Sequence, residues 1–221
     1  MSIEVKICGI NSAEAADATL VARADFAGLV FHLSSPRQVN GEQAASLAAR
    51  LRGRTRIVAL LCDPRDEEVA AAVKAARPDF IQLHGKETPE RVAAIRAQFA
   101  VPVMKVIAIS ESSDLAVVSS YEKVADRLLF DAKPPSAAAR EGGHGTAFDW
   151  QLLHGRSFSR PWLLAGGLNS QNVARAIQIA GAPGVDVSSG VETSPGVKSA
   201  ALIHDFVKNA RSARYAKEAQ A

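Results

Sequence analysis

The chain has 221 residues, of which 48% are hydrophobic, so it can bury one large core, and α/β barrels reach this length as single domains. The formal charge of +3 comes from scattered Lys and Arg rather than a basic block, which argues against nucleic acid and suits small anionic ligands. No stretch approaches the ~18 apolar residues of a membrane span, and no signal sequence precedes the first predicted strand, so we expect a cytoplasmic protein without a membrane partner.

Short β-branched runs alternate with longer Ala-rich segments eight times along the chain. Each short run is mostly apolar, as in strands that are covered on both faces. The predicted strands are 3–8, 26–31, 56–62, 79–84, 102–109, 126–131, 161–166 and 184–188. The predicted helices are 12–24, 40–52, 65–77, 88–99, 111–124, 147–154, 169–180 and 197–210.

Eight strand–helix units without a break in composition predict a closed (β/α)8 barrel, whereas an open flavodoxin-like sheet needs only five or six. The barrel is expected to cover residues 1–210, followed by a polar tail at 211–221. Asn11, Thr88 and Asn169 precede predicted helices and are expected to cap them.

Chemistry in such a barrel lies where the strands end, because the βα loops surround the open mouth. Cys8 ends the first predicted strand and Asp131 ends the sixth. A thiol and a carboxyl would therefore meet at one mouth as an acid/base pair. Three further candidates lie in these loops: Arg37 within SerProArg, His84 within GlnLeuHisGly, and Gly143 within GlyGlyHisGly.

Two neighbouring loops carry the residue types that bind phosphate. Gly166 and Gly167 follow the seventh strand, and Ser189 and Gly190 follow the eighth. Glycines let the backbone approach an anion closely, and the start of a helix after Asn169 would add unpaired N–H groups. The alternative is that these glycines only form tight turns. No G-x-G-x-x-G follows any strand, which argues against a dinucleotide cofactor.

Lys6 precedes Cys8 by two residues and shares its strand face, with Asp186 expected on the adjoining last strand. Two interpretations remain open: Lys6 places positive charge beneath the thiolate of Cys8, or Lys6 and Asp186 form a purely structural ion pair. Cys62 belongs to no motif, and both cysteines are expected to be free thiols. The five histidines show no metal-ligand spacing, so no metal is expected.

The chain resembles the phosphoribosylanthranilate isomerase family of tryptophan biosynthesis. The motifs that carry the resemblance, in order, are LysIleCysGlyIle, GlyLeuValPheHisLeuSerSerProArg, IleGlnLeuHisGly, LeuLeuPheAsp, GlyGlyHisGlyThrAlaPheAspTrp, LeuAlaGlyGlyLeu and ValAspValSerSerGlyValGlu through ProGlyValLys. They extend from about residue 5 to 200, with departures at His32, Leu33 and His144.

The resemblance implies an Amadori rearrangement without a cofactor, with Cys8 as general base and Asp131 as general acid. Its substrate, N-(5-phosphoribosyl)anthranilate, is a small phosphosugar with an aromatic carboxylate. The planar fork of Arg37 matches that carboxylate bidentately, while His84 is expected to line the mouth. The sequence does not determine the oligomeric state.

Two alternatives remain. The histidine-pathway aminoaldose isomerase does similar chemistry on a similar barrel, but resembling it would require Asp in place of Cys8 and two similar half-barrels. A non-catalytic phosphosugar-binding barrel would keep the glycine loops but would not need both Cys8 and Asp131.

Overall fold

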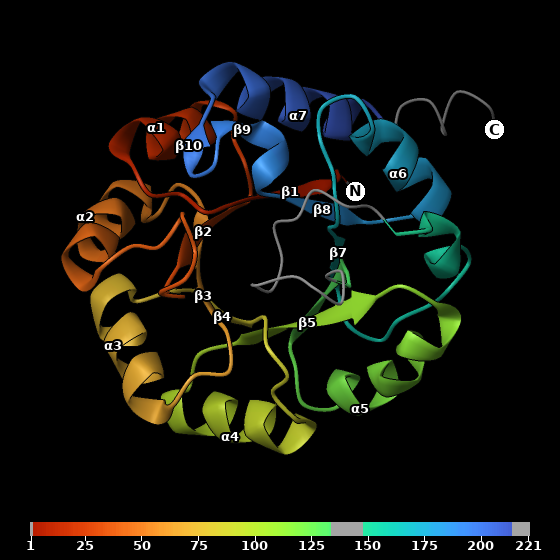
Figure 1. Ribbon diagram of the computed structural model, residues 1–221, viewed down its shortest axis with the longest axis horizontal. Coiled ribbons are helices and arrows are strands. Elements are labelled where there is room, and N and C mark those ends of the chain that lie inside the picture. The colour runs from red at the N-terminus through yellow and green to blue at the C-terminus, as the bar shows by residue number, and fades with distance from the viewer. Residues whose placement is uncertain (1, 134–147, 214–221) are drawn as a thin grey trace.

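A computed structural model describes residues 2–133 and 148–213. Eight parallel strands form a closed barrel, with helices arranged in a ring outside it (Figure 1). The predicted (β/α)8 fold is therefore confirmed. The barrel strands are β1 (Glu4–Cys8), β2 (Phe26–Val30), β3 (Arg56–Leu61), β4 (Phe80–Leu83), β5 (Val103–Ile109), β6 (Arg127–Ala132), β7 (Trp162–Leu164) and β8 (Gly184–Val187).

Most helices follow the predicted segments. They are α1 (Ala13–Val21), α2 (Gly41–Leu51), α3 (Asp66–Ala76), α4 (Pro89–Phe99), α5 (Val118–Glu122), α6 (Val173–Ala180) and α7 (Ala200–Ser212), with 3-10 segments η1 (Ser112–Val117), η2 (Trp150–Leu153) and η3 (Ser189–Val191). The α7 helix extends two residues past the predicted barrel boundary at 210. Thr88 caps α4 as predicted, through a hydrogen bond from Arg91 N. No described helix is long and apolar enough to cross a bilayer.

The single helix predicted over 111–124 is wrong, because the segment divides into η1 and the short α5. Asp114 accepts hydrogen bonds from the backbone N–H groups of Ser110 and Glu111, at 2.8 and 3.1 Å, and this local bonding favours a turn over a helix. In the described part of 147–154, only the four-residue η2 is helical.

Residues 192–198 form a small hairpin that the sequence did not predict, with strands β9 (Glu192–Ser194) and β10 (Val197–Lys198). The strands are too short to show a period. Asn11, which was expected to cap α1, instead donates from Nδ2 to Gly196 O at 3.0 Å, and Ser12 is the cap. In Figure 1 the hairpin lies beside α1 at the rim of the barrel.

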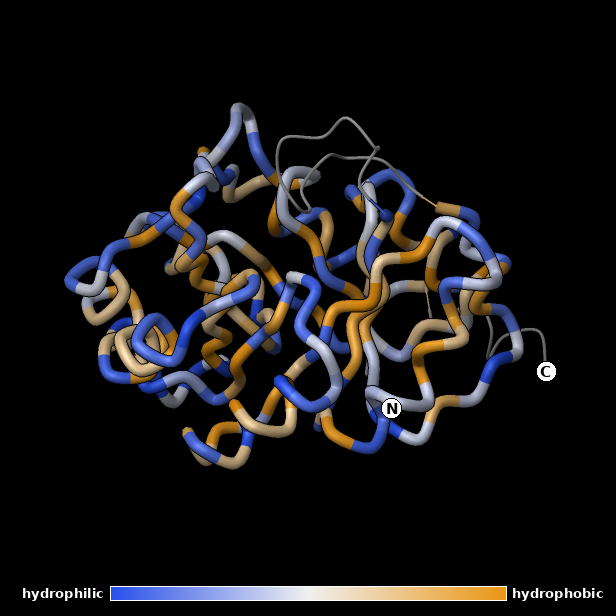
Figure 2. Tube along the Cα trace, turned by 60° about the horizontal axis from the view of Figure 1, so that its bottom comes forward, coloured by the Kyte–Doolittle hydropathy of each residue, from blue (hydrophilic) through white to orange (hydrophobic). Residues whose placement is uncertain are grey.

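The barrel has a hydrophobic layer outside its strands and a mixed interior. Figure 2 shows hydrophobic stretches along the strands in the middle of the molecule. The largest core cluster joins strand residues such as Val5, Leu29 and Ile81 to helix residues such as Leu47 and Ile203. The helices thus supply the main apolar burial, which leaves the barrel interior free to carry polar groups.

Three aspartates repeat at the amino ends of alternate strands. Asp25, Asp79 and Asp126 directly precede β2, β4 and β6. Each accepts a hydrogen bond from a backbone N–H of the preceding strand, at Val5, Ile57 and Val103, with distances of 2.8, 2.7 and 2.9 Å. These bonds join neighbouring strands at the end of the barrel where the amino ends of the strands lie.

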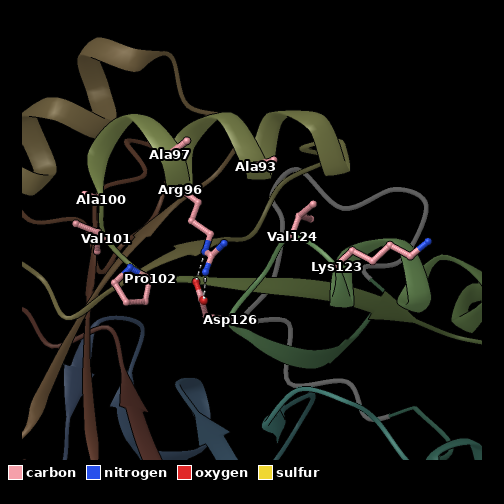
Figure 3. A pocket seen from close by; sticks show the side chains of 9 residues that line it. All are labelled: Ala93, Arg96, Ala97, Ala100, Val101, Pro102, Lys123, Val124 and Asp126. Atoms are coloured by element: carbon pink, nitrogen blue, oxygen red, sulfur yellow. Dashed lines mark hydrogen bonds and ion pairs between the residues drawn. The ribbon is translucent and has the colours of Figure 1, made fainter.

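Asp126 also accepts two hydrogen bonds from the guanidinium of Arg96, from Nε at 2.9 Å and from Nη2 at 2.8 Å. This pair lies beside a surface hollow of about 410 Å³ (Figure 3). The hollow lies between α4 and the starts of β5 and β6, with Pro102 and Val124 among its lining residues. It is therefore at the opposite end of the strands from Cys8 and Asp131.

Replacing Asp25 should destabilise the barrel. Asp25→Ala leaves the buried N–H of Val5 without its acceptor, so we expect the free energy of unfolding to fall by roughly 1.5–3 kcal/mol, the range for a hydrogen bond to a charged group. Urea unfolding measures it. Asp17→Ala removes an exposed ion pair with Arg50 and should change stability by less than about 1 kcal/mol. Equal losses in the two variants would contradict the role of the Asp25 bond.

Candidate active site

Cys8 and Asp131 lie at the carboxyl ends of β1 and β6 and therefore face the same mouth of the barrel. Cys8 is 5% exposed, and the side chain of Asp131 is 14% exposed. A substrate in the mouth can thus reach both groups, while bulk water has little access to the thiol.

Lys6 and Asp186 form a buried ion pair beneath Cys8. Lys6 Nζ lies 2.8 Å from Asp186 Oδ1, and the two residues are paired in the register of β1 with β8. Burial lowers the pKa of Lys6, but the charges of Asp186 and Cys8 outweigh it, so the pKa is raised and the ammonium stays charged. The expected ion pair is therefore present.

Burial raises the pKa of the Cys8 thiol above its ordinary value. The charge of Lys6 opposes this rise, Asp186 adds to it, and Lys198 again opposes it. Lys6 thus affects the thiol as well as forming a structural pair, so the two interpretations from the sequence are not exclusive.

Gly28 of β2 provides the space for this arrangement. A Cβ atom at Gly28 would lie 3.0 Å from Cys8 Sγ and 3.2 Å from Lys6 Nζ. The residue was not among the predicted site residues. The feature of the sequence that could have identified Gly28 is a glycine inside an otherwise apolar strand, which often marks a place where another group approaches the backbone closely.

His84 contacts the predicted acid directly. Its Nε2 lies 3.2 Å from Asp131 Oδ2, and Asp131 Oδ1 accepts from Ala132 N at 2.8 Å. On the other side of the ring, Nδ1 lies 3.2 Å from Nε2 of the buried Gln82. When the Gln82 amide donates to Nδ1, the ring carries its proton on Nε2 and donates it to Asp131.

Arg37 lies in the loop after β2, with its side chain 7% exposed. One edge of its guanidinium is already occupied: Nε and Nη2 donate to Glu192 Oε1 and Oε2 at 2.7 and 2.8 Å. Glu192 also accepts from Lys198 Nζ at 2.6 Å. Glu192 and Lys198 were not predicted, although both lie within the motifs of the resemblance. The predicted fork of Arg37 is thus only partly available to a ligand.

The two glycine loops lie against each other. A Cβ atom at Gly190 would lie 1.9 Å from Leu168 O, so only glycine fits there. Gly166 and Gly167 have φ angles of +86° and +62°, the left-handed region that favours glycine. Among the described residues, the N–H groups of Gly167, Ser189 and Gly190 have no acceptor, and such groups are suited to binding an anion.

Two of the expected N–H groups after Asn169, those of Gln171 and Asn172, already have an acceptor within the turn. Asn169 N donates to Asn172 Oδ1, while Gln171 N and Asn172 N donate to Asn169 Oδ1. The α6 helix begins only at Val173, so Asn169 stabilises the turn before it rather than capping the helix. Gly143 lies outside the described residues. Within residues 2–133 and 148–213, no group of three His, Cys, Asp or Glu could hold a metal ion.

A closed (β/α)8 barrel with a buried thiol, a carboxyl and backbone N–H groups around one mouth has the architecture of the (β/α)8 enzyme class. The model of the N-(5'-phosphoribosyl)anthranilate (PRA) isomerase family matches residues 5–209. The chain belongs to this family.

Similar proteins agree with the family match. A curated N-(5'-phosphoribosyl)anthranilate isomerase from Azorhizobium caulinodans is 53% identical over 216 residues, 98% of this chain and 95% of that protein. Its counterpart from Paramagnetospirillum magneticum is 49% identical and covers 97% of this chain and 100% of its own length.

Solved structures show the same similarity. The phosphoribosyl anthranilate isomerase of Thermotoga maritima has a TM-score of 0.85 and 33% identity, covering 95% of this chain and 99% of that one. A phosphoribosyl anthranilate isomerase in complex with reduced 1-(o-carboxyphenylamino)-1-deoxyribulose 5-phosphate has a TM-score of 0.82 and 31% identity, covering 95% of this chain and 99% of that one.

The ionisation of Cys8 should respond in opposite directions to its two charged neighbours. Lys6→Met should raise the thiol pKa, because it removes a favourable charge, whereas Asp186→Asn should lower it. The pH dependence of Cys8 alkylation, followed by mass spectrometry in a Cys62→Ala background, measures both shifts. Shifts in the same direction would indicate general loosening of the barrel instead.

Proposed function

We propose that the chain converts N-(5'-phosphoribosyl)anthranilate to 1-(2-carboxyphenylamino)-1-deoxyribulose 5-phosphate, an Amadori rearrangement of tryptophan biosynthesis. The observation that carries the proposal is the position of Cys8 and Asp131 at one mouth of a barrel whose family match extends over residues 5–209. The partner is a small phosphosugar carrying an anthranilate group, and the reaction needs neither metal nor redox cofactor.

Asp131 is the general acid in this mechanism. It donates its proton to the ring oxygen of the ribose, which breaks the bond from that oxygen to C1 and leaves an iminium ion. The resulting carboxylate accepts a hydrogen bond from His84 Nε2, which lies 3.2 Å from Oδ2. His84 thus stabilises the acid after it has lost its proton.

Cys8 is the general base. Its thiolate removes the proton from C2 of the sugar, and the C–H electrons neutralise the iminium and form the enol-amine. The enol-amine then tautomerises to the ketone product. Burial raises the pKa of Cys8, and the positive charge of Lys6 opposes this rise. Lys6 therefore makes it easier for the thiol to lose its proton. The acidic limb of kcat against pH therefore belongs to Cys8.

The two anionic ends of the substrate use different kinds of donor. The N–H groups of Gly167, Ser189 and Gly190 bind the phosphate, supported by their lack of acceptors among the described residues. Arg37 binds the anthranilate carboxylate through Nη1 and the remaining hydrogen of Nη2, because Glu192 occupies its other edge. Gly166 shapes the phosphate loop, and Asp186 holds Lys6.

Removing either proton-transfer group should abolish turnover but spare binding. We expect Cys8→Ala and Asp131→Asn each to reduce kcat at least ~10²-fold, the low end for general acid–base catalysis, while a product analogue still binds within about tenfold of wild type. The assay forms the substrate in situ and follows the loss of its anthranilate fluorescence. Cys62→Ala is the control and should be near neutral. Full activity of either variant would remove the mechanism.

The two anion sites should be separable by mutation. Arg37→Ala should weaken a carboxylate-bearing product analogue by roughly 1.5–3 kcal/mol and leave inorganic phosphate nearly unaffected. Gly167→Ala should weaken phosphate, because a methyl group obstructs the backbone approach. Gly155→Ala is the matched control, since Gly155 has a similar φ of +68° and faces open space. Calorimetric titration of each variant with the product analogue and with inorganic phosphate measures these affinities. Loss of phosphate binding in Arg37→Ala alone would reverse the proposed substrate orientation.

A further inference from the structure

We propose that Glu192 is a positioning residue that presents Arg37 to the substrate carboxylate and holds Lys198 beside Cys8, which makes the β9–β10 hairpin a specificity element. This inference rests on the proposed function, since it concerns how the same site distinguishes a carboxylate-bearing aromatic group from a neutral one.

The geometry of the Arg37–Glu192 pair carries the first step. Both side chains are almost fully buried, at 7% and 4% exposure, and two parallel hydrogen bonds of 2.7 and 2.8 Å join them. These bonds fix the plane of the guanidinium. Nη1 donates to no other described residue, so the end edge, formed by Nη1 and the second hydrogen of Nη2, is free for a second carboxylate.

Lys198 extends the cluster toward Cys8. Its fully buried Nζ donates to Glu192 Oε1 at 2.6 Å and to Ser188 O at 3.0 Å. Ser188 Oγ in turn donates to Cys8 O at 3.2 Å. Burial lowers the pKa of Lys198, and the charges of Glu192 and Cys8 oppose that effect. Glu192 thus holds two cations: Arg37, which is proposed to bind the substrate carboxylate, and Lys198, whose charge acts on the Cys8 thiol.

The charge of the cluster suits an anion. Arg37 and Lys198 contribute two positive charges and Glu192 one negative charge, which leaves one positive charge in a buried setting. Burial raises the pKa of Glu192, but hydrogen bonds and charges from Arg37 and Lys198 outweigh it, so the pKa is lowered and the group is ionised. Buried charges are normally paired, and the substrate carboxylate would complete the pairing.

The surrounding backbone is shaped around these side chains. Gly9 has a φ of +82°, and a Cβ atom there would lie 2.5 Å from Cδ of Arg37. Gly196 has a φ of +84°, its N–H donates to Glu192 Oε2 at 3.2 Å, and a Cβ atom would lie 2.6 Å from Pro36 O. The hairpin therefore packs closely against the loops that follow β1 and β2, next to Arg37.

A purely structural role for Glu192 is the rival explanation, in which its ion pairs only attach the hairpin to the barrel. The two explanations differ in ligand selectivity. A positioning role makes binding of the carboxylate depend on Glu192, whereas a structural role affects all ligands, or stability alone.

The test compares two product analogues, the reduced carboxyphenylamino-deoxyribulose phosphate and the phenylamino compound that lacks the aromatic carboxylate. We expect Glu192→Gln to reduce the affinity ratio between them by about tenfold, because a mobile Arg37 must be ordered on binding. In an Arg37→Ala background, Glu192→Gln should leave the ratio unchanged, since there is no guanidinium to orient. Calorimetric titration measures both.

Glu4→Gln is the matched control. Glu4 also bridges two cations, Arg56 and Arg127, at 2.7 and 2.6 Å, but at the amino ends of the strands. This variant should lower stability and leave the affinity ratio at the wild-type value. If wild type turns over the substrate and Glu192→Gln keeps the wild-type ratio, the positioning role is overturned. Absence of wild-type turnover would instead refute the proposed function.

Discussion

The buried ion pair between Lys6 and Asp186 lies across the seam where the first and last strands close the barrel. An unpaired charge in this interior would be very costly, so the pair favours the register that places Lys6 opposite Asp186. The same pair lies beneath Cys8 and contributes two opposing charges to the thiol. Barrel closure and the ionisation of the proposed base therefore depend on one interaction.

Charged groups occupy three levels of the barrel. Glu4 joins Arg56 and Arg127 near the amino ends of the strands, and their guanidinium groups lie over the ring of Phe26 at 3.7 and 5.0 Å. The Lys6 pair lies in the middle, and the Glu192 cluster lies at the mouth. Apolar side chains fill another part of the interior, in a cluster that includes Met104, Leu129 and Leu163, while the larger apolar cluster lies between the strands and the helices. The barrel can thus keep a functional polar interior without losing its fold.

The two proposed proton-transfer groups have different surroundings. Cys8 is buried between cations and depends on them for its ionisation, whereas Asp131 lies at the mouth with one neutral donor, the backbone N–H of Ala132, and one titratable neighbour, His84. A base that must lose its proton is thus placed near positive charge, while an acid that must keep one is not. This division fits a reaction in which one group takes a proton and the other gives one.

The sequence by itself determined the eight barrel strands, most of the helices and the positions of Cys8 and Asp131 at strand ends, because burial on both faces and helical periodicity are local patterns. It also indicated the Lys6–Asp186 pair, since barrel topology makes the first and last strands neighbours. Only the tertiary structure decided the contacts of Arg37 with Glu192, 155 residues away, and of His84 with Asp131. These contacts form between residues of different strand–helix units, with no shared period in the sequence. Their geometry exists only once the barrel has closed and brought the strand ends together.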